Sequence, residues 1–216
     1  AVAEKFLTGG DLEEIPIDAV SFRALSKMTA RTRDRGLSSG RIAILIDEWI
    51  DERFNRPVSD VPTFTGRPPE MAAQEVRARW GLGEQPVGNF VHLLEAHGVR
   101  IYALTDDNKD LDAYCLKWSN RPFVFLSHAK SAERTRFNAA HELGHLVLHG
   151  EDQTPHGQEA EQEANQFAAA FLMPRAGVLA QGLTNASVSR VLVAKQRWNV
   201  SAMAMAHRAN ELGLMT

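Results

Sequence analysis

One short segment limits the fold and chemistry of this chain more than any other feature of its sequence. Residues 136–149 contain the letters HELGH at 141–145, an H-E-x-x-H pattern inside a run that can be helical. On a helix, positions i and i+4 lie on one face, so His141 and His145 can hold one metal ion while Glu142 addresses a water molecule bound to it. The pattern predicts a metal site for peptide hydrolysis. The alternative is a helix that carries two histidines and a glutamate without a metal.

The composition is that of a soluble globular protein. Of the 216 residues, 44% are hydrophobic and 24% are charged, and the net charge of -3 gives no general affinity for nucleic acid. The single cysteine, Cys115, allows no internal disulfide, which suits the cytoplasm. Neither a signal segment nor an apolar run near the ~18 residues of a membrane-spanning helix is present in the sequence. We therefore expect a cytoplasmic protein that binds neither nucleic acid nor membrane.

The first 69 residues are predicted to form a helical and linker region. Ser38 or Ser39 suits an N-cap, and large apolar side chains then recur at the spacing of an amphipathic helix. These side chains are Ile42, Leu45, Ile46, Trp49, Ile50 and Phe54. Prolines concentrated between residues 55 and 69 mark a linker. We therefore place the main boundary there, with an N-terminal region at 1–69 and a second domain at 70–216.

The second domain alternates helices with short strands. Helices are predicted at 70–80, 87–97, 132–149 and 158–173, a strand at 99–104, and a hairpin from strands at 113–118 and 122–126. Two helical stretches follow within 187–214. They could mimic a helix-turn-helix, but a capping helical pair is favoured because the second stretch has few basic side chains that could read bases. The pattern predicts an α+β fold with a small sheet packed on the motif helix.

A catalytic zinc site needs a third protein ligand besides the two histidines. The continuation found in metzincins is missing from this sequence. His149 lies about 12 Å along the helix axis from His141 and cannot share the ion. Asp152 and His156 in the following loop stay open as ligands, and so do the glutamates of the helix predicted at 158–173.

Helix geometry ranks these glutamates. The apolar face of their helix is formed by Ala160, Ala164, Phe167, Ala168, Phe171 and Leu172. At ~100° per residue, Glu161 lies roughly 65° from the centre of that face, Glu163 about 95° and Glu159 about 135°. Glu161 is therefore predicted as the third ligand, and the other two as solvated charges. Asn165, one turn after Glu161, could hydrogen-bond a ligand histidine.

The predicted centre implies a mechanism. Zn²⁺ held by His141, His145 and Glu161 would lower the pKa of its water toward ~7 and polarise a peptide carbonyl, with Glu142 as general base. Mn²⁺ suits the same ligands, so the sequence does not choose between the two metals.

The strand predicted at 122–126 suggests where a substrate binds. This strand directly precedes the motif helix, and it could present an edge on which an extended peptide docks by strand addition. On this hypothesis Phe123, Val124 and Phe125 contact the substrate.

Two motifs together resemble the ImmA/IrrE family of metallopeptidases. They are RFNAAHELGHLVLH at 136–149 and EQEANQFAAAFLMPR at 161–175, and the similarity extends from residue 87 to the C-terminus. The combination of H-E-L-G-H with E-x-x-x-N-x-F-A and Leu-Met-Pro is specific. The resemblance implies a zincin-like (gluzincin) fold, His141, His145 and Glu161 as metal ligands, and Glu142 as the catalytic acid/base.

The segment SFRALSKMTARTRDRG at 21–36 resembles the middle of longer bacterial regulators, in which an Xre-type helix-turn-helix precedes an ImmA/IrrE domain. No such motif is recognisable in residues 1–37 and the chain begins at Ala1, so we expect that a DNA-binding head is missing. Some family members cleave a partner repressor, which implies an Xre-type repressor as substrate. In the fused regulators the domain can instead serve as a sensor or dimerisation module, so the alternative is a metal-binding sensor or dimerisation module without proteolytic turnover, which could form a homodimer.

Overall fold

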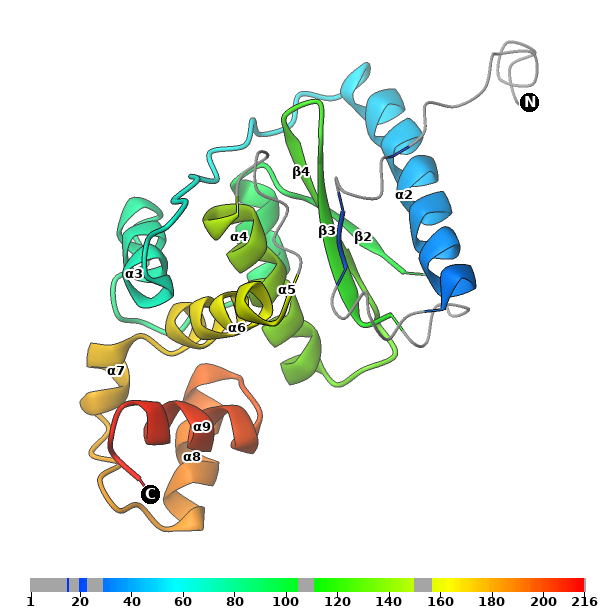
Figure 1. The fold of residues 1–216 in the computed structure, drawn as a ribbon. Helices are drawn as coiled ribbons and strands as arrows, with labels where there is room; N and C mark the ends of the chain where they lie inside the picture. Colours follow the sequence, from blue (N-terminus) through cyan, green and yellow to red (C-terminus); the bar gives the residue numbers. More distant parts are fainter. Residues whose placement is uncertain (1–14, 16–19, 23–28, 105–110, 150–156, 216) are drawn as a thin grey trace, which may run out of the picture.

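The computed structural model describes residues 15, 20–22, 29–104, 111–149 and 157–215. Its helices, labelled in Figure 1, are α2 (Ala30–Asp51), α3 (Pro69–Arg79), α4 (Phe90–Ala96), α5 (Ala132–Leu148), α6 (Gln158–Leu172), α7 (Arg175–Leu179), α8 (Val188–Trp198) and α9 (Ala202–Glu211). Its strands are β1 (Val20–Phe22), β2 (Arg100–Ala103), β3 (Ala113–Trp118) and β4 (Arg121–Leu126). Within these ranges, no helix is both long and apolar enough to cross a membrane. The loop residues Asp152 and His156 lie outside the described residues.

The strands form one sheet in the order β1-β3-β4-β2. β3 and β4 make the predicted antiparallel hairpin, closed by Ser119 and Asn120 with φ angles of 47° and 63°, which suit a two-residue turn. β2 runs parallel to β4, and β1, which the sequence did not predict, pairs antiparallel with β3. The predicted α+β class is therefore confirmed, with one more strand than expected.

Both faces of this sheet are buried. Successive side chains of β3 and β4 alternate between two apolar clusters, as the two-residue period of a strand requires. Ala113, Cys115, Val124 and Leu126 join the cluster of α5, while Tyr114, Leu116, Phe123 and Phe125 join Ala43 and Ile44 of α2. Figure 1 shows α2 on one side of the sheet and α4, α5 and α6 on the other. The motif helix α5 thus packs on the face of the sheet opposite α2, and the predicted packing of the sheet on this helix is observed.

α2 begins earlier than the sequence suggested. Its N-cap is Thr29, whose hydroxyl accepts a hydrogen bond from the Thr32 backbone N–H at 3.2 Å. Ser38, predicted as a possible cap, lies inside the helix and donates its hydroxyl to the Asp34 carbonyl. Serine is the stronger N-cap residue of the two, so the sequence favoured the later serines over the threonine that caps the helix.

The large apolar stripe of α2 faces solvent, and its small residues face the sheet. Ile42, Ile46 and Trp49 are 58%, 46% and 54% exposed. On the buried side, a Cβ added at Gly40 would meet the Tyr114 hydroxyl at 3.2 Å, so the helix lies very close to the aromatic side chains of the sheet. Apolar periodicity predicted the helix but not the face that packs on the sheet. The helix lies so close to the sheet that small residues occupy the packed face, and the large apolar residues lie on the other face.

α2 also carries a buried carboxylate that ties it to the sheet. Asp47 is fully buried and contacts Arg56 at 2.7 Å, Arg121 at 3.4 Å and the Tyr102 hydroxyl at 3.1 Å. Tyr102 and Arg121 belong to β2 and β4, so residues before the predicted boundary pack directly on residues after it. The division at residues 69 and 70 remains a prediction.

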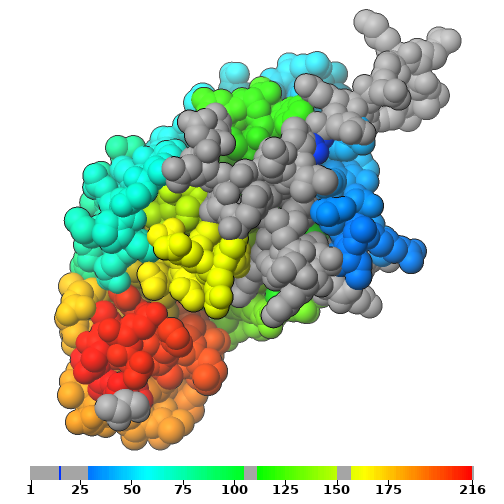
Figure 2. All heavy atoms as spheres, in the orientation of Figure 1, coloured from blue at the N-terminus to red at the C-terminus, as the bar shows by residue number. Residues whose placement is uncertain are grey.

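The C-terminal helices α7, α8 and α9 form a lobe below α3 and α6 (Figures 1 and 2). Arg208 of α9 is buried, binds both carboxylate oxygens of Glu70 at 2.7 Å, and donates to the Met173 carbonyl at 3.0 Å. α9 is therefore fastened to the start of α3 and to the end of α6. This anchoring agrees with a capping helical pair.

Candidate metal centre

The two histidines of the motif point at one place. α5 begins after Ser131, whose hydroxyl caps the Arg134 N–H, and it keeps a regular helix through the motif. His141 and His145 therefore project from one face, both almost fully buried, with their Nε2 atoms 3.0 Å apart. Buried nitrogens need a hydrogen-bond or metal partner, and both of these nitrogens face the same position.

Glu161 of α6 completes the group. One of its carboxylate oxygens lies 3.2 Å from His145 Nε2, and the other lies 3.5 Å from His141 Nε2. Burial acts to raise the pKa of the Glu161 carboxyl, but hydrogen bonds and charge from the two imidazoles outweigh it and hold that pKa well below its usual range. The side chain is 28% exposed, so one side of the group is open.

These separations fit a tetrahedral metal ion. Zinc bonds nitrogen and oxygen at ~2.0–2.2 Å, so two of its ligand atoms lie roughly 3.3 Å apart. The separations of 3.0, 3.2 and 3.5 Å match that edge, and among the described residues this is the group of His, Cys, Asp and Glu side chains that could hold a metal. Two neutral imidazoles and one carboxylate are a donor set for zinc or manganese.

Close packing of α5 on α6 brings the three side chains together. A Cβ added at Gly144 would lie 3.1 Å from both the Cα and the carbonyl oxygen of Ala164. The glycine of the motif thus allows the two helix backbones to touch. This contact lies one residue from His145 on α5 and three residues from Glu161 on α6, so it sets the width of the centre.

Replacing Gly144 by alanine is expected to lower the free energy of unfolding by about 1 kcal/mol, even though alanine favours helices by about 1 kcal/mol. Overpacking against rigid backbone costs ~1–3 kcal/mol, which exceeds that gain. Urea unfolding measures the difference. Gly88→Ala is the matched control, because a Cβ there meets nothing within 4 Å. A Gly144→Ala protein as stable as the wild type would contradict the backbone contact.

The second ring nitrogen of each ligand histidine, Nδ1, also has a polar contact. The Nδ1 atom of His141 lies 3.0 Å from Asn165 Oδ1, the residue predicted for this contact. The Nδ1 atom of His145 lies 3.2 Å from His149 Nδ1, and His149 Nε2 lies 2.9 Å from a carboxylate oxygen of Glu163. Burial lowers the pKa of His149, although Glu163 acts in the opposite direction. Glu163, expected as a solvated charge, is 41% exposed and also contacts His149.

Glu142 follows His141 directly on α5. Its side chain is fully buried, close enough to Cys115 of β3 for its charge to act on the thiol. Burial, followed by the charges of Glu142 and Glu161, raises the pKa of the Cys115 thiol well above its usual value, so the thiol keeps its proton. Nothing in the spacing of Cys115 ties it to the motif, so its place near Glu142 could not be predicted.

The prediction that the strand at 122–126 presents a free edge to a substrate is wrong. β4 pairs with β3 on one side and with β2 on the other, so its backbone groups are already used. Phe123, Val124 and Phe125 are at most 1% exposed and belong to the two apolar clusters. The run of apolar residues at 122–126 marks a central strand buried on both faces, which sequence order alone does not separate from an edge.

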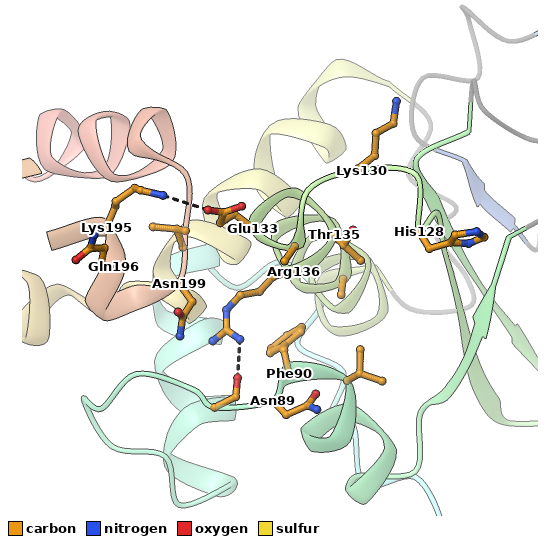
Figure 3. A pocket seen from close by; sticks show the side chains of 15 residues that line it. Asn89, Phe90, His128, Lys130, Glu133, Thr135, Arg136, Lys195, Gln196 and Asn199 are labelled. Atoms are coloured by element: carbon orange, nitrogen blue, oxygen red, sulfur yellow. Dashed lines mark hydrogen bonds and ion pairs between the residues drawn. The ribbon is translucent and has the colours of Figure 1, made fainter. Parts of the chain in front are cut away.

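A pocket of about 750 Å³ lies on the other side of α5, between α4 and the end of α8 (Figure 3). Arg136 reaches across it to the Gly88 carbonyl at 2.7 Å, and Lys195 of α8 pairs with Glu133 at 3.1 Å. None of the residues of the metal centre lines this pocket. These contacts join α8 to the start of the motif helix, away from the histidines.

The chain belongs to the family described as Peptidase_M78, IrrE N-terminal-like domain, whose sequence model matches residues 94–210, more than half of the chain. The family membership predicted from the two motifs is therefore confirmed. Among solved structures, the chain is similar to a Mycobacterium tuberculosis transcriptional regulator at 18% sequence identity and a TM-score of 0.46. That match covers 66% of this chain and 46% of the regulator, so the chain spans less than half of that protein. A search of curated proteins gave no match.

Proposed function

We propose that this protein is a zinc-dependent endopeptidase that cuts a regulatory protein, such as a helix-turn-helix repressor of the Xre type in the cytoplasm. One observation carries the proposal: His141, His145 and Glu161 meet at metal-ligand separations directly beside the buried Glu142. Membership of a peptidase family supports peptide hydrolysis as the reaction. The arrangement also agrees with a zincin-like site, in which the metal lies on the motif helix.

The side chains around the centre have distinct roles in this proposal. When bound, zinc lowers the pKa of water toward ~7 and polarises the carbonyl of the scissile peptide. Glu142 accepts a proton from the attacking water at its carboxylate and passes it to the amine nitrogen that leaves. Hydrogen bonds at Nδ1 keep His141 and His145 oriented, with Nε2 directed to the ion.

The test is cleavage of candidate repressors by the purified protein loaded with Zn²⁺ or, in parallel, Mn²⁺. We expect discrete fragments of one Xre-type repressor, and no fragments after the metal is removed with a chelator. Mass spectrometry of the fragments identifies the cleaved bond, and metal analysis of the purified protein identifies the native ion. A protein that carries its metal and cuts no repressor would remove the support for this function.

A second function, a metal-binding dimerisation module of a transcriptional regulator, is favoured by the exposed stripe of Ile42, Ile46 and Trp49 on α2. We propose a second copy of this chain as its occupant. Arg41 and Glu48 lie two turns apart along one flank of the stripe. When two copies of α2 pair antiparallel about a twofold axis, Arg41 of each copy lies opposite Glu48 of the other, while the apolar residues meet.

Sedimentation of the whole protein tests this interface. We expect a dimer that Trp49→Lys converts to a monomer, whereas Val58→Lys, a control at a residue 89% exposed outside the helix, leaves it dimeric. Arg41→Glu should weaken the dimer. The double variant that carries both Arg41→Glu and Glu48→Arg should restore it, because the two charges are exchanged. The fold should stay within ~0.5 kcal/mol of the wild type, because these are surface positions. A wild-type protein that is monomeric at every concentration would rule out the pairing.

A further inference from the structure

Two residues outside the metal centre form a hydrogen-bonded extension of it. His149 is the C-cap residue of α5, and its side chain is 10% exposed. One ring nitrogen, Nδ1, lies 3.2 Å from His145 Nδ1, and the other, Nε2, lies 2.9 Å from Glu163 Oε2 on α6. A continuous chain of polar contacts therefore runs from the centre through two imidazoles to a carboxylate at the surface.

The direction of every hydrogen bond in this chain is fixed once His145 holds a cation. The metal takes the lone pair of His145 Nε2, so the proton of that neutral ring must be on Nδ1, where it donates to His149. His149 Nδ1 is then an acceptor, which puts the proton of His149 on Nε2. That N–H donates to Glu163, whose carboxylate can only accept. No other arrangement with two neutral rings satisfies both contacts.

We propose that His149 and Glu163 are positioning residues, which fix the tautomer and the ring orientation of His145 for metal binding. His149 is too far along the helix to be a ligand of the same ion as His141. Instead it supplies the acceptor at Nδ1 that a metal-bound histidine commonly has, and Glu163 orients His149 in turn. The inference rests on the metal centre of the proposed function.

α6 thus supplies a metal ligand and also the side chains that orient both ligand histidines. Glu161 contacts the two Nε2 atoms directly. Asn165 contacts Nδ1 of His141 directly, whereas Glu163 reaches Nδ1 of His145 through His149. The asymmetry follows from position, because His145 lies one turn nearer the end of α5, where His149 at i+4 stands beside it.

The experiment measures zinc affinity by competition with a chelator, with no substrate present. We expect His149→Phe, which keeps a ring but has no acceptor, to weaken zinc binding ~10–100-fold. His149→Asn, which retains a side-chain carbonyl as acceptor, should recover part of this loss. Glu163→Ala should also weaken binding, and Glu159→Ala, which removes an exposed carboxylate from the same helix, should not.

Two further readouts separate positioning from a merely structural role. The double variant of His149→Phe and Glu163→Ala should bind zinc no more weakly than His149→Phe alone, because Glu163 acts through His149. Nitrogen NMR of the zinc-loaded wild type should show His145 protonated at Nδ1 and His149 at Nε2. Equal zinc affinity in all variants, additive losses, or the opposite tautomers would overturn the proposal. A protein that binds zinc through this arrangement but cuts no repressor would instead contradict only the proposed peptidase function.

Discussion

Glu142→Gln is expected to abolish peptide cleavage while the protein still folds and binds its metal. The amide has the size of the carboxylate, so the packing around this fully buried side chain is preserved. It cannot accept a proton from water at neutral pH. General base catalysis contributes ~10²–10⁴-fold to a rate, and cleavage should fall by that factor or more. The rate of fragment formation and the bound metal are measured on the same preparation.

Glu133→Gln is the matched control for this variant. It makes the same chemical change at the first turn of the same helix, where Glu133 pairs with Lys195 and takes no part in the centre. We expect wild-type cleavage from it. The Glu142→Gln protein should also retain a substrate that it cannot cut, which allows the partner to be isolated. Equal fragment yields from Glu142→Gln and the wild type would exclude Glu142 as the base.

Local sequence periodicity predicted the elements that build the centre. α5, α6, β3 and β4 lie within two residues of their predicted bounds, because strong helical and strand periods and clear caps define them. The inward turn of Glu161 also followed from one helix, since its angle from the buried face depends only on its neighbours along that helix. The orientation of a side chain relative to the buried face of its own helix could therefore be predicted from the sequence.

Features that depend on contacts between distant segments could not be predicted in this way. Cys115 lies near Glu142 because β3 packs against α5, and Glu163 contacts His149 because α6 packs closely on α5 at Gly144. β4 lies between β3 and β2 in the sheet, and no local sequence pattern predicts this order of strands. The spacing of His149 four residues after His145 was a usable signal for their contact.

Removing the carboxylate of Glu161 is expected to have the largest effect on metal binding. Glu161→Ala leaves two imidazoles and no anionic ligand, so zinc affinity should fall by more than the ~10–100-fold typical of residues that only support a ligand. A bound ion stabilises the fold by about 2.7 kcal/mol when its concentration is 100 times its Kd. At a zinc concentration that gives this gain in the wild type, the Glu161→Ala protein should gain almost nothing.

Thermal unfolding with and without zinc measures this difference for three glutamates of one helix. Glu159→Ala should keep the full zinc-dependent rise in Tm, because Glu159 is exposed at the first turn of α6. Glu163→Ala should keep part of it, and Glu161→Ala almost none. This order reflects how each carboxylate contacts the ligand histidines. Glu161 contacts them directly, Glu163 contacts His145 through His149, and Glu159 contacts neither. If zinc raised the Tm of Glu161→Ala as much as that of Glu159→Ala, the third ligand would have to be sought elsewhere in the chain.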